Sequence, residues 1–370
     1  MTAKRNAGRK QKQGPAGLMW AAVYRGERQV RAEQVPVPQP GRGEALVRVD
    51  TCGVCATDLK KVEYGLVPPP RIFGHEMAGV IERVGPEVKS WKPGQRVAVL
   101  HHIPCGDCAF CRRREYSRCE TYKRTGTTAG FEPSGGGFSQ FIRVMPWVVE
   151  RGMFRVPARI ALEEACFLEP VNTCLKAVDR LALRKDDVVL VFGQGPIGLI
   201  FNQLLRVRGA RVLGLDLLVR RRALGRQLGA HLVADPRERA FDEELWKLTR
   251  GGGADAAVIA VPSETAFQQA MKAVRPDGKV LLFAHTRRGD MVSVDAGAVC
   301  VDEKTILGSY SAAFESLPET ARLIFARKVK VAPLISHRYP LARIQEGFEL
   351  AMHPIDQSLK IVIKPQEKLP

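Results

Sequence analysis

The chain has 370 residues, of which 45% are hydrophobic, and this is enough for two hydrophobic cores. Lys and Arg outnumber Asp and Glu by 57 to 39, so the net charge is +18 and the isoelectric point is near 9.8. No stretch reaches the roughly 18 uninterrupted apolar residues of a membrane span, and the N-terminus has no apolar signal core. We therefore expect a soluble, cytoplasmic protein with reduced cysteines and no membrane partner.

The excess positive charge begins in residues 1–18, a polar, glycine-containing segment without acidic residues. Its cations are Lys4, Arg5, Arg9, Lys10 and Lys12. This composition predicts a disordered basic tail. Elsewhere cations alternate with acids, as in Arg237-Glu238-Arg239, and no basic motif interleaved with aromatic residues occurs. We expect no nucleic-acid partner, and nucleic-acid binding through the tail is the alternative from a different functional class.

The first candidate metal site combines Cys52 and Cys55 with Gly74-His75-Glu76, in which His75 comes twenty residues after Cys55. Thiolate and imidazole are zinc ligands, and a catalytic zinc needs about three protein ligands plus an open position. Glu169, in Leu168-Glu169-Pro170, is a candidate for the remaining anionic ligand. Each piece alone has an ordinary explanation, such as two buried thiols, a core histidine or the start of a helix.

A second cysteine group lies within fifteen residues and has the spacing C-x2-C-x2-C-x7-C. Its members are Cys105, Cys108, Cys111 and Cys119. Four thiolates at this spacing can surround one tetrahedral metal ion, and the polar intervening residues offer no apolar run to hold the loop by packing. The pattern predicts a structural metal site. An iron–sulfur cluster would also take four thiolates, but the other motifs of the chain favour zinc.

A dinucleotide-binding turn is predicted in the middle of the chain. The apolar run 188–192 leads into Gly193-Gln194-Gly195-Pro196-Ile197-Gly198 and then into a helical stretch. The glycines let backbone N–H groups and a helix N-terminus approach a pyrophosphate. A second strand, 211–215, ends at Asp216, 23 residues after Gly193, where a carboxylate can bond the adenosine ribose hydroxyls.

Strands alternate with helices from about residue 176 to residue 309. The predicted strands are 188–192, 211–216, 231–234, 256–260 and 279–284, and the predicted helices include 220–228 and 264–274. This alternation predicts a parallel, doubly wound sheet with right-handed crossovers. Before it, short strands punctuated by Gly and Pro predominate.

Together these motifs resemble the zinc-dependent medium-chain dehydrogenases, the family of the alcohol, sorbitol and threonine dehydrogenases. The resemblance extends from Ala21-Ala22-Val23-Tyr24 to Lys360-Ile361-Val362-Ile363, with the order and spacing of all three motifs preserved. It implies an α/β protein in which a GroES-like, mostly-β catalytic domain is joined to a Rossmann domain. The implied order is a basic tail (1–18), the GroES-like domain (19–175), the Rossmann domain (176–309) and a segment returning to the catalytic domain (310–370).

The family pattern C-x-[ST]-D assigns the catalytic metal ligand to Cys55 rather than Cys52, because only Cys55 is followed by Thr57 and Asp58. The resemblance implies that Thr57 takes the substrate hydroxyl proton and that Asp58 orients His75. Where the family often has a relay histidine, this chain has Lys60. A lysine could relay protons only with a pKa well below about 10.4, so water carrying the proton is an equal alternative. The cysteines outside both metal sites, Cys52, Cys166, Cys174 and Cys300, are predicted to be buried.

Glu169 matches the carboxylate that the polyol and threonine dehydrogenases place near zinc, so the chain resembles that branch. Glu76 is then either a fourth ligand or exchanges with Glu169. The resemblance also places Thr173 and Arg221 beside the cofactor. Asp216 favours NAD over NADP because its carboxylate would repel a 2′-phosphate, although the neighbouring arginines weaken this preference.

The expected reaction is reversible oxidation of a secondary alcohol of the polyol, sugar or inositol type to a ketone by NAD, with two zinc ions per chain. The family usually forms homodimers or homotetramers. Threonine, other amino alcohols and sugar phosphates are alternative substrates on the same scaffold. A zinc-free, NADPH-dependent quinone or enone reductase is disfavoured, because it would need neither Cys55 with His75 nor the four-cysteine loop.

Overall fold

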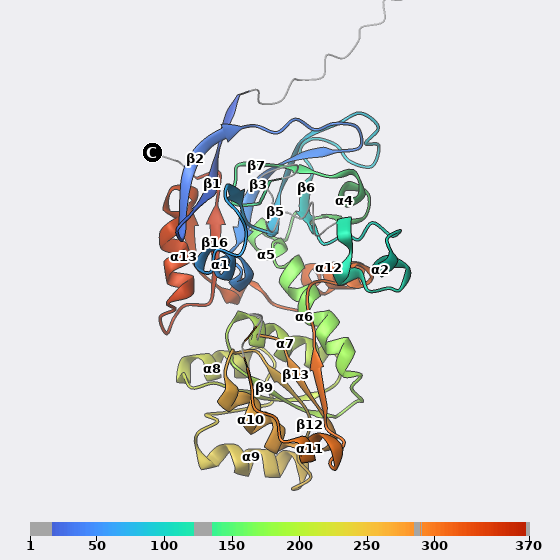
Figure 1. The fold of residues 1–370 in the computed structure, drawn as a ribbon, viewed down its shortest axis with the longest axis vertical. Coiled ribbons are helices and arrows are strands. Elements are labelled where there is room, and N and C mark those ends of the chain that lie inside the picture. The colour runs from blue at the N-terminus through green and yellow to red at the C-terminus, as the bar shows by residue number, and fades with distance from the viewer. Residues whose placement is uncertain (1–16, 122–134, 285–288, 290, 368–370) are drawn as a thin grey trace, which may run out of the picture.

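The computed structural model describes residues 17–121, 135–284, 289 and 291–367. They form two parts stacked along the long axis of Figure 1, an upper part rich in strands and a lower part in which helices surround a sheet. Among these residues, no helix is both long and apolar enough to cross a membrane. Residues 1–16, most of the predicted tail, lie outside the described ranges, and strand structure begins at Leu18.

Within the described part of the chain, the lower sheet has six parallel strands in the order β11-β10-β9-β12-β13-β14. The strands are β9 (Val188–Phe192), β10 (Arg211–Leu215), β11 (Leu232–Ala234), β12 (Ala254–Ile259), β13 (Val274–Leu282) and β14 (Thr305–Gly308). The intervening helices are α7 (Pro196–Val207), α8 (Val219–Gln227), α9 (Arg239–Thr249), α10 (Glu264–Ala273) and α11 (Ala296–Cys300). This arrangement confirms the predicted doubly wound sheet.

The predicted strand boundaries agree best with the structure where the apolar pattern of the sequence is strongest. All five residues of β9 are buried, as expected for a β-branched run between two other parallel strands. By contrast, β13 begins five residues before the predicted start, because Val274 already pairs with Ala254 ahead of a register irregularity. A short irregular pairing of this kind leaves no periodic signal in the sequence.

The upper part contains a seven-stranded sheet along the path β15-β16-β3-β5-β6-β8, with β7 beside β3, and a three-stranded sheet β2-β1-β4; both counts apply to the described ranges. The strands are β1 (Leu18–Gly26), β2 (Gln29–Pro36), β3 (Ala45–Gly53), β4 (Arg71–Ile72), β5 (Glu76–Val84), β6 (Arg96–Val99), β7 (Phe141–Val144), β8 (Met153–Arg155), β15 (Ile335–Pro340) and β16 (Lys360–Lys364). The C-terminal strands thus return to the sheet that contains β3, which places residues more than 300 positions apart side by side.

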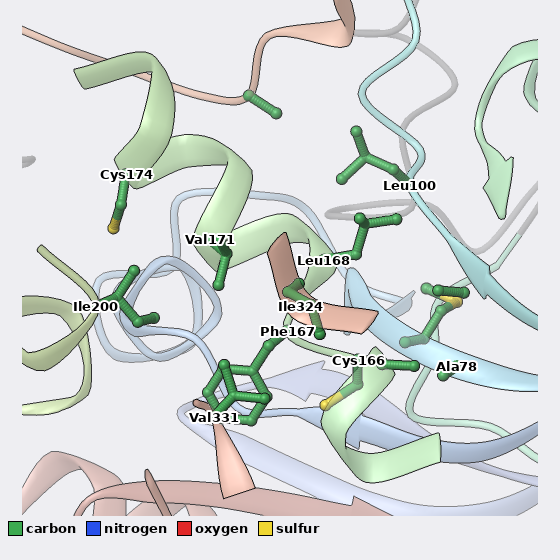
Figure 2. Close-up of a cluster of buried hydrophobic side chains, with 14 of the residues drawn as sticks. Ala78, Leu100, Cys166, Phe167, Leu168, Val171, Cys174, Ile200, Ile324 and Val331 are labelled. Atoms are coloured by element: carbon green, nitrogen blue, oxygen red, sulfur yellow. The ribbon is translucent and has the colours of Figure 1, made fainter. Parts of the chain in front are cut away.

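Helices fill the space around and between the sheets. The longer ones outside the lower sheet are α1 (Ala56–Glu63), α6 (Leu168–Leu181), α12 (Leu317–Phe325) and α13 (Ile344–Met352); the short ones are α2 (Ala109–Arg112), α4 (Pro146–Arg151) and α5 (Leu162–Ala165). Helix α6 runs between the two parts in Figure 1. Figure 2 shows its buried face, where Val171 lies near Ile200 of α7 and Ile324 of α12. Each such fully buried side chain contributes about 1.5–3 kcal/mol, so this shared core fixes the two parts against each other.

The four cysteines predicted to be buried outside the metal sites do not all behave alike. Cys52, Cys166 and Cys174 are buried, as predicted. Cys300 is exposed, so that prediction is wrong. The reason is its position at the end of α11, a five-residue helix none of whose residues is buried. Small size makes a cysteine easy to bury, but only a neighbouring element can cover it.

Candidate active site

The strand register of the upper sheet brings the first predicted metal ligands together. Strands β3 and β5 are antiparallel, and Gly53 at the end of β3 lies opposite Glu76 at the start of β5. Cys55 follows β3, and His75 immediately precedes β5. As a result, one ligand atom from each of Cys55, His75 and Glu76 lies within 4.8 Å of the other two. We call these three residues the catalytic cluster.

Local structure prepares Cys55 and His75 for metal binding. Cys55 is the N-cap of α1, and its sulfur accepts a hydrogen bond from the Thr57 backbone N–H at 3.5 Å, which fixes the direction of the side chain. His75 Nδ1 lies 3.3 Å from Asp58 Oδ1, and both side chains are buried. This contact leaves Nε2 of the imidazole for a metal, in the carboxylate–histidine arrangement typical of zinc sites.

Glu169 lies in the wall facing the cluster rather than within it. Its Oε1 is 3.5 Å from His102 Nδ1, and it accepts a hydrogen bond from the Thr173 hydroxyl at 3.2 Å. The His75 and His102 rings are 5.8 Å apart, so Glu169 remains close to the cluster. Burial raises the pKa of Glu169 to about 7. The three residues whose ligand atoms converge therefore include Glu76, and Glu169 forms a second polar group with His102 and Thr173.

Two side chains of the site, those of His102 and Lys360, were not predicted from the sequence. His102 lies three residues before the four-cysteine loop, and its proximity to that loop was the only available signal. Lys360, the first residue of β16, forms a buried ion pair with Glu76. A lysine at the start of a strand is ordinarily interpreted as a solvated strand end, and only the tertiary structure, in which β16 pairs with β3, shows that Lys360 is buried.

The catalytic cluster opens into a cavity of about 450 Å³ that both parts of the molecule line. The upper part contributes the cluster, Thr57, Lys60, His102, Glu169 and Thr173, and the lower part contributes Gly195, Pro196, Ile197 and Arg221. Of the predicted site residues, the cluster and Gly195, Pro196 and Ile197 of the glycine turn thus face the same cavity, whereas Gly193, Gly198 and Asp216 are not among the residues that line it. A metal ion held by the cluster and a cofactor held by the turn would share that space.

The glycine turn has the geometry of a phosphate-binding loop. Gly193 has φ 93°, which favours glycine, and a Cβ there would overlap the Val261 side chain. Among the described residues, no heavy atom beyond the chain neighbours of Gly195 would lie within 4 Å of a Cβ at this position, so this backbone faces open space at the N-terminus of α7. A Cβ at Gly198 would overlap the Gly193 carbonyl, so the third glycine permits close strand–helix packing. This is the division of roles that a dinucleotide site requires.

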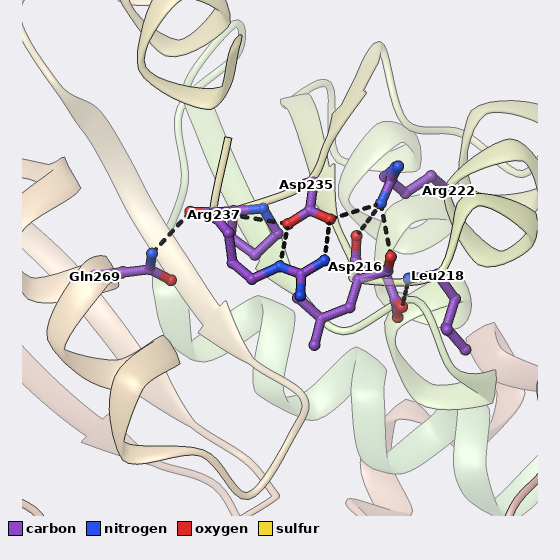
Figure 3. Close-up of polar contacts among 8 residues, drawn as sticks. Asp216, Leu218, Arg222, Asp235, Arg237 and Gln269 are labelled. Atoms are coloured by element: carbon purple, nitrogen blue, oxygen red, sulfur yellow. Dashed lines mark hydrogen bonds and ion pairs between the residues drawn. The ribbon is translucent and has the colours of Figure 1, made fainter. Parts of the chain in front are cut away.

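Asp216 is fixed at the end of β10. It accepts hydrogen bonds from the Gln194 backbone N–H at 2.7 Å and from the Leu218 backbone N–H at 2.9 Å. Figure 3 shows how Arg222 is held: it donates to the Asp216 carbonyl at 2.8 Å and to Asp235 Oδ2 at 3.2 Å. The Arg237 side chain also donates two hydrogen bonds to Asp235, and these lower the pKa of the Asp235 carboxyl. Arg222 is therefore engaged away from the cavity, whereas Arg221 lines it.

The four cysteines of the second group also converge. The ligand atoms of all four lie within 4.8 Å of one another, and the Cys111 sulfur is 3.5 Å from that of Cys108 and 3.9 Å from that of Cys105. A tetrahedral zinc site with bonds of about 2.3 Å has sulfur separations of about 3.8 Å. Backbone hydrogen bonds from Asp107 and Cys108 lower the pKa of Cys105 to about 6, while burial raises that of Cys111 to about 12. The four convergent sulfur atoms and their separations fit the donor set of a zinc site.

Comparisons with known proteins agree with this geometry. Residues 41–155 match the family model of the alcohol dehydrogenase GroES-like domain, and residues 196–326 match that of the zinc-binding dehydrogenases. The chain is 31% identical over 328 residues to L-threonine 3-dehydrogenase of Pyrococcus abyssi, covering 86% of this chain and 90% of that protein. It is 28% identical over 353 residues to sorbitol dehydrogenase of Bacillus subtilis, covering 94% and 97%.

A solved structure extends the match to the full fold. The crystal structure of AibC superposes with a TM-score of 0.82 at 33% sequence identity, covering 99% of this chain and 100% of that one. The matched GroES-like segment contains β3 to β8 of the upper part, and the matched zinc-binding segment contains α7 and β10 to β14 of the lower part. The chain therefore belongs to the zinc-dependent medium-chain dehydrogenases, in the branch that includes the polyol and threonine dehydrogenases, and is an oxidoreductase of the alcohol dehydrogenase type.

Proposed function

We propose that the protein catalyses the reversible oxidation of a secondary alcohol of the polyol class to a ketone, with NAD as the hydride acceptor. The observation that carries this proposal is the single cavity shared by the catalytic cluster and the glycine turn. When bound there, zinc supplies a Lewis acid that stabilises negative charge on the substrate oxygen, and the nicotinamide accepts the hydride. Metal binding, orientation, proton transfer and exclusion of water are the tasks of the chain's own residues.

These residues would hold the zinc, orient its ligands and take a proton from the substrate. Cys55, His75 and Glu76 would hold the catalytic zinc, with Asp58 fixing the imidazole. The Thr57 hydroxyl lies in the cavity wall, where it would accept the substrate proton before passing it on. The apolar remainder of the wall would exclude water from the reacting carbon. In the second site, the four cysteines would hold a structural zinc, giving two zinc ions per chain.

The substrate class is tested by a panel of polyols, inositols and β-hydroxy amino acids, with NADH formation followed by absorbance. We expect turnover with a polyol or inositol. Turnover confined to threonine would instead favour the second candidate, threonine dehydrogenation, which is supported by the 31% identity to a threonine dehydrogenase. A zinc-loaded protein that oxidises no alcohol with either NAD or NADP would overturn the proposal.

We infer that the cofactor is NAD because the Asp216 carboxylate is fixed by two backbone amides at the place where the adenosine ribose would lie. Asp216→Asn keeps the shape and removes the charge. The ratio of kcat/KM for NADP to that for NAD should rise about tenfold or more, in line with the loss of a charged hydrogen bond to the ribose and of repulsion toward a 2′-phosphate. Arg220→Ala, an exposed neighbour outside the cavity wall, is the control and should leave the ratio unchanged.

A wild-type ratio that already favours NADP would mean that Arg221, the arginine in the cavity wall, outweighs the carboxylate. Arg221→Ala would then lower kcat/KM for NADP selectively. The two variants together separate the effect of the carboxylate from that of the guanidinium.

The two glutamates near the metal should differ in their effects. Glu76 belongs to the catalytic cluster, so Glu76→Gln should lower the zinc content of that site. Glu169 faces the cluster from α6 beside His102, so Glu169→Gln should retain zinc but lower kcat/KM by on the order of 10²-fold, as expected for a group acting on the substrate or on the ligand completing the site. Zinc content by elemental analysis and steady-state kinetics provide both measurements. The reverse pattern would transfer the ligand role from Glu76 to Glu169.

A further inference from the structure

Lys360 and Glu76 form a buried ion pair at the edge of the catalytic cluster. Lys360 is 7% exposed and Glu76 is 1% exposed, and the lysine ammonium contacts Glu76 Oε2. Three adjacent strands create this contact: β16 begins at Lys360 and pairs with β3, and β3 pairs with β5, which begins at Glu76. The contact therefore belongs to the body of the sheet and does not depend on a loop.

Gly53, the last residue of β3, leaves room for the ion pair between Lys360 and Glu76. Gly53 pairs with Val362 of β16 on one side and with Glu76 of β5 on the other. A Cβ at Gly53 would overlap Glu76 Oε2 and would lie 2.8 Å from Lys360 Cε. The φ of Gly53 is not in the positive range that favours glycine, so space, rather than backbone conformation, accounts for the residue here. The absence of a side chain lets the ammonium and the carboxylate meet.

The same carboxylate is thus within reach of two cations. A carboxylate oxygen of Glu76 lies within 4.8 Å of ligand atoms of Cys55 and His75, where the metal would be held, and Glu76 Oε2 contacts the ammonium of Lys360. A buried ammonium without a partner is costly, so the lysine is strongly held to whichever carboxylate it can reach.

We propose that Lys360 competes with the metal ion for Glu76, which makes Glu76 an exchangeable ligand and lowers the affinity of the catalytic site for zinc. This inference rests on the proposed function only insofar as Glu76 belongs to the metal-binding set. Lys360 is a positioning residue in this scheme, since it acts through Glu76. The consequence is a site whose coordination can open for a substrate oxygen without loss of the metal from Cys55 and His75.

A purely structural ion pair predicts the opposite sign. If Lys360 only oriented Glu76 for the metal, its removal would weaken zinc binding, because supporting contacts of metal ligands typically add to affinity. If Lys360 competes, its removal leaves Glu76 with the metal as its remaining cationic partner in the catalytic cluster, and zinc binds more tightly. The direction of the change in zinc affinity therefore separates the two roles.

The test uses Lys360→Met in the full chain, with the zinc affinity of the catalytic site measured by competition with a chromophoric chelator. We expect the variant to bind zinc about tenfold more tightly than the wild type, because Glu76 is released from its contact with the ammonium, and about tenfold is the order of magnitude for one charge-assisted hydrogen bond. The cobalt-substituted variant should show a changed visible absorption spectrum, reporting altered coordination by Glu76. Lys360→Arg should restore the affinity of the wild type. Unchanged or weaker zinc binding in Lys360→Met would overturn the proposal.

Lys364 provides a matched control in the same strand. It pairs with Asp50 Oδ1 at 2.7 Å, away from the catalytic cluster, so Lys364→Met removes a lysine and an ion pair without touching Glu76. Its zinc affinity should equal that of the wild type. If Lys360→Met does not fold, Lys360→Gln carries the same measurement and the same expected direction.

Combining the lysine change with Glu76→Gln tests the route of the effect. With Glu76 neutral, replacing Lys360 should no longer tighten zinc binding appreciably. If the Lys360 change raised the zinc affinity equally with Glu76 and with Gln at that position, the lysine would act through its charge alone. The proposal that it competes for the carboxylate would then be wrong. These affinities are measured without substrate, so a failure of the proposed polyol oxidation would leave them interpretable, and a failed affinity result would not alter the substrate panel.

Discussion

Cys55→Ala should abolish turnover while leaving the protein folded, and it should retain about one of the two zinc ions that we propose for the wild type. The thiolate supplies negative charge and one of three convergent ligand atoms, so its loss should lower kcat by on the order of 10³-fold or more and empty the catalytic site. Elemental analysis should then find about one zinc per chain, held by the four-cysteine loop. Steady-state kinetics and thermal unfolding complete the measurement.

Cys52→Ala is the control for this variant, because Cys52 is a buried thiol three residues earlier in the same segment. It lies opposite Met77 in the sheet and is not part of the catalytic cluster. It should retain both zinc ions and most of the activity. Loss of the catalytic zinc from Cys52→Ala, with retention by Cys55→Ala, would reverse the assignment of the ligand.

Cys111→Ala should have the largest effect on stability. Cys111 is buried, and its sulfur lies close to those of Cys105 and Cys108. Among the residues that the structure describes, the cysteines and Tyr116 make up the apolar cluster of this loop, so a bound metal would supply most of its folding free energy. We expect the free energy of unfolding to fall by on the order of 5 kcal/mol, accompanied by loss of one zinc. Denaturant unfolding and elemental analysis measure both.

The matched control is Cys174→Ala, which removes a buried thiol of the hydrophobic core rather than of the loop. It should lower stability by only about 1 kcal/mol and leave the zinc content unchanged. A Cys111 variant that keeps two zinc ions and wild-type stability would show that the loop does not depend on a metal. Packing of Tyr116 against Phe314, at 4.8 Å between ring centroids, would then have to account for its structure.

Recognition of the reaction class from sequence worked because its signals are local. The spacing of the four cysteines, the glycines around Gly195 and the acidic residue after β10 each occupy a short segment, and short-range geometry decides whether such residues can bind one ligand. Strand β9 lies where the sequence placed it because five buried apolar residues admit few alternatives. The same reasoning failed for Cys300, since burial depends on which element covers a residue.

The details of the catalytic cluster depended on contacts that no local pattern contains. Lys360 meets Glu76 across 284 positions of chain, because β16 returns to pair with β3. His102 and Glu169 meet because α6 lies beside the segment that precedes the four-cysteine loop. The residue types and their spacing in the sequence determined which chemistry this protein can support. Only the tertiary structure shows that Glu76 converges with Cys55 and His75 and that Lys360 contacts Glu76, because strand register and helix packing set distances that sequence separation does not.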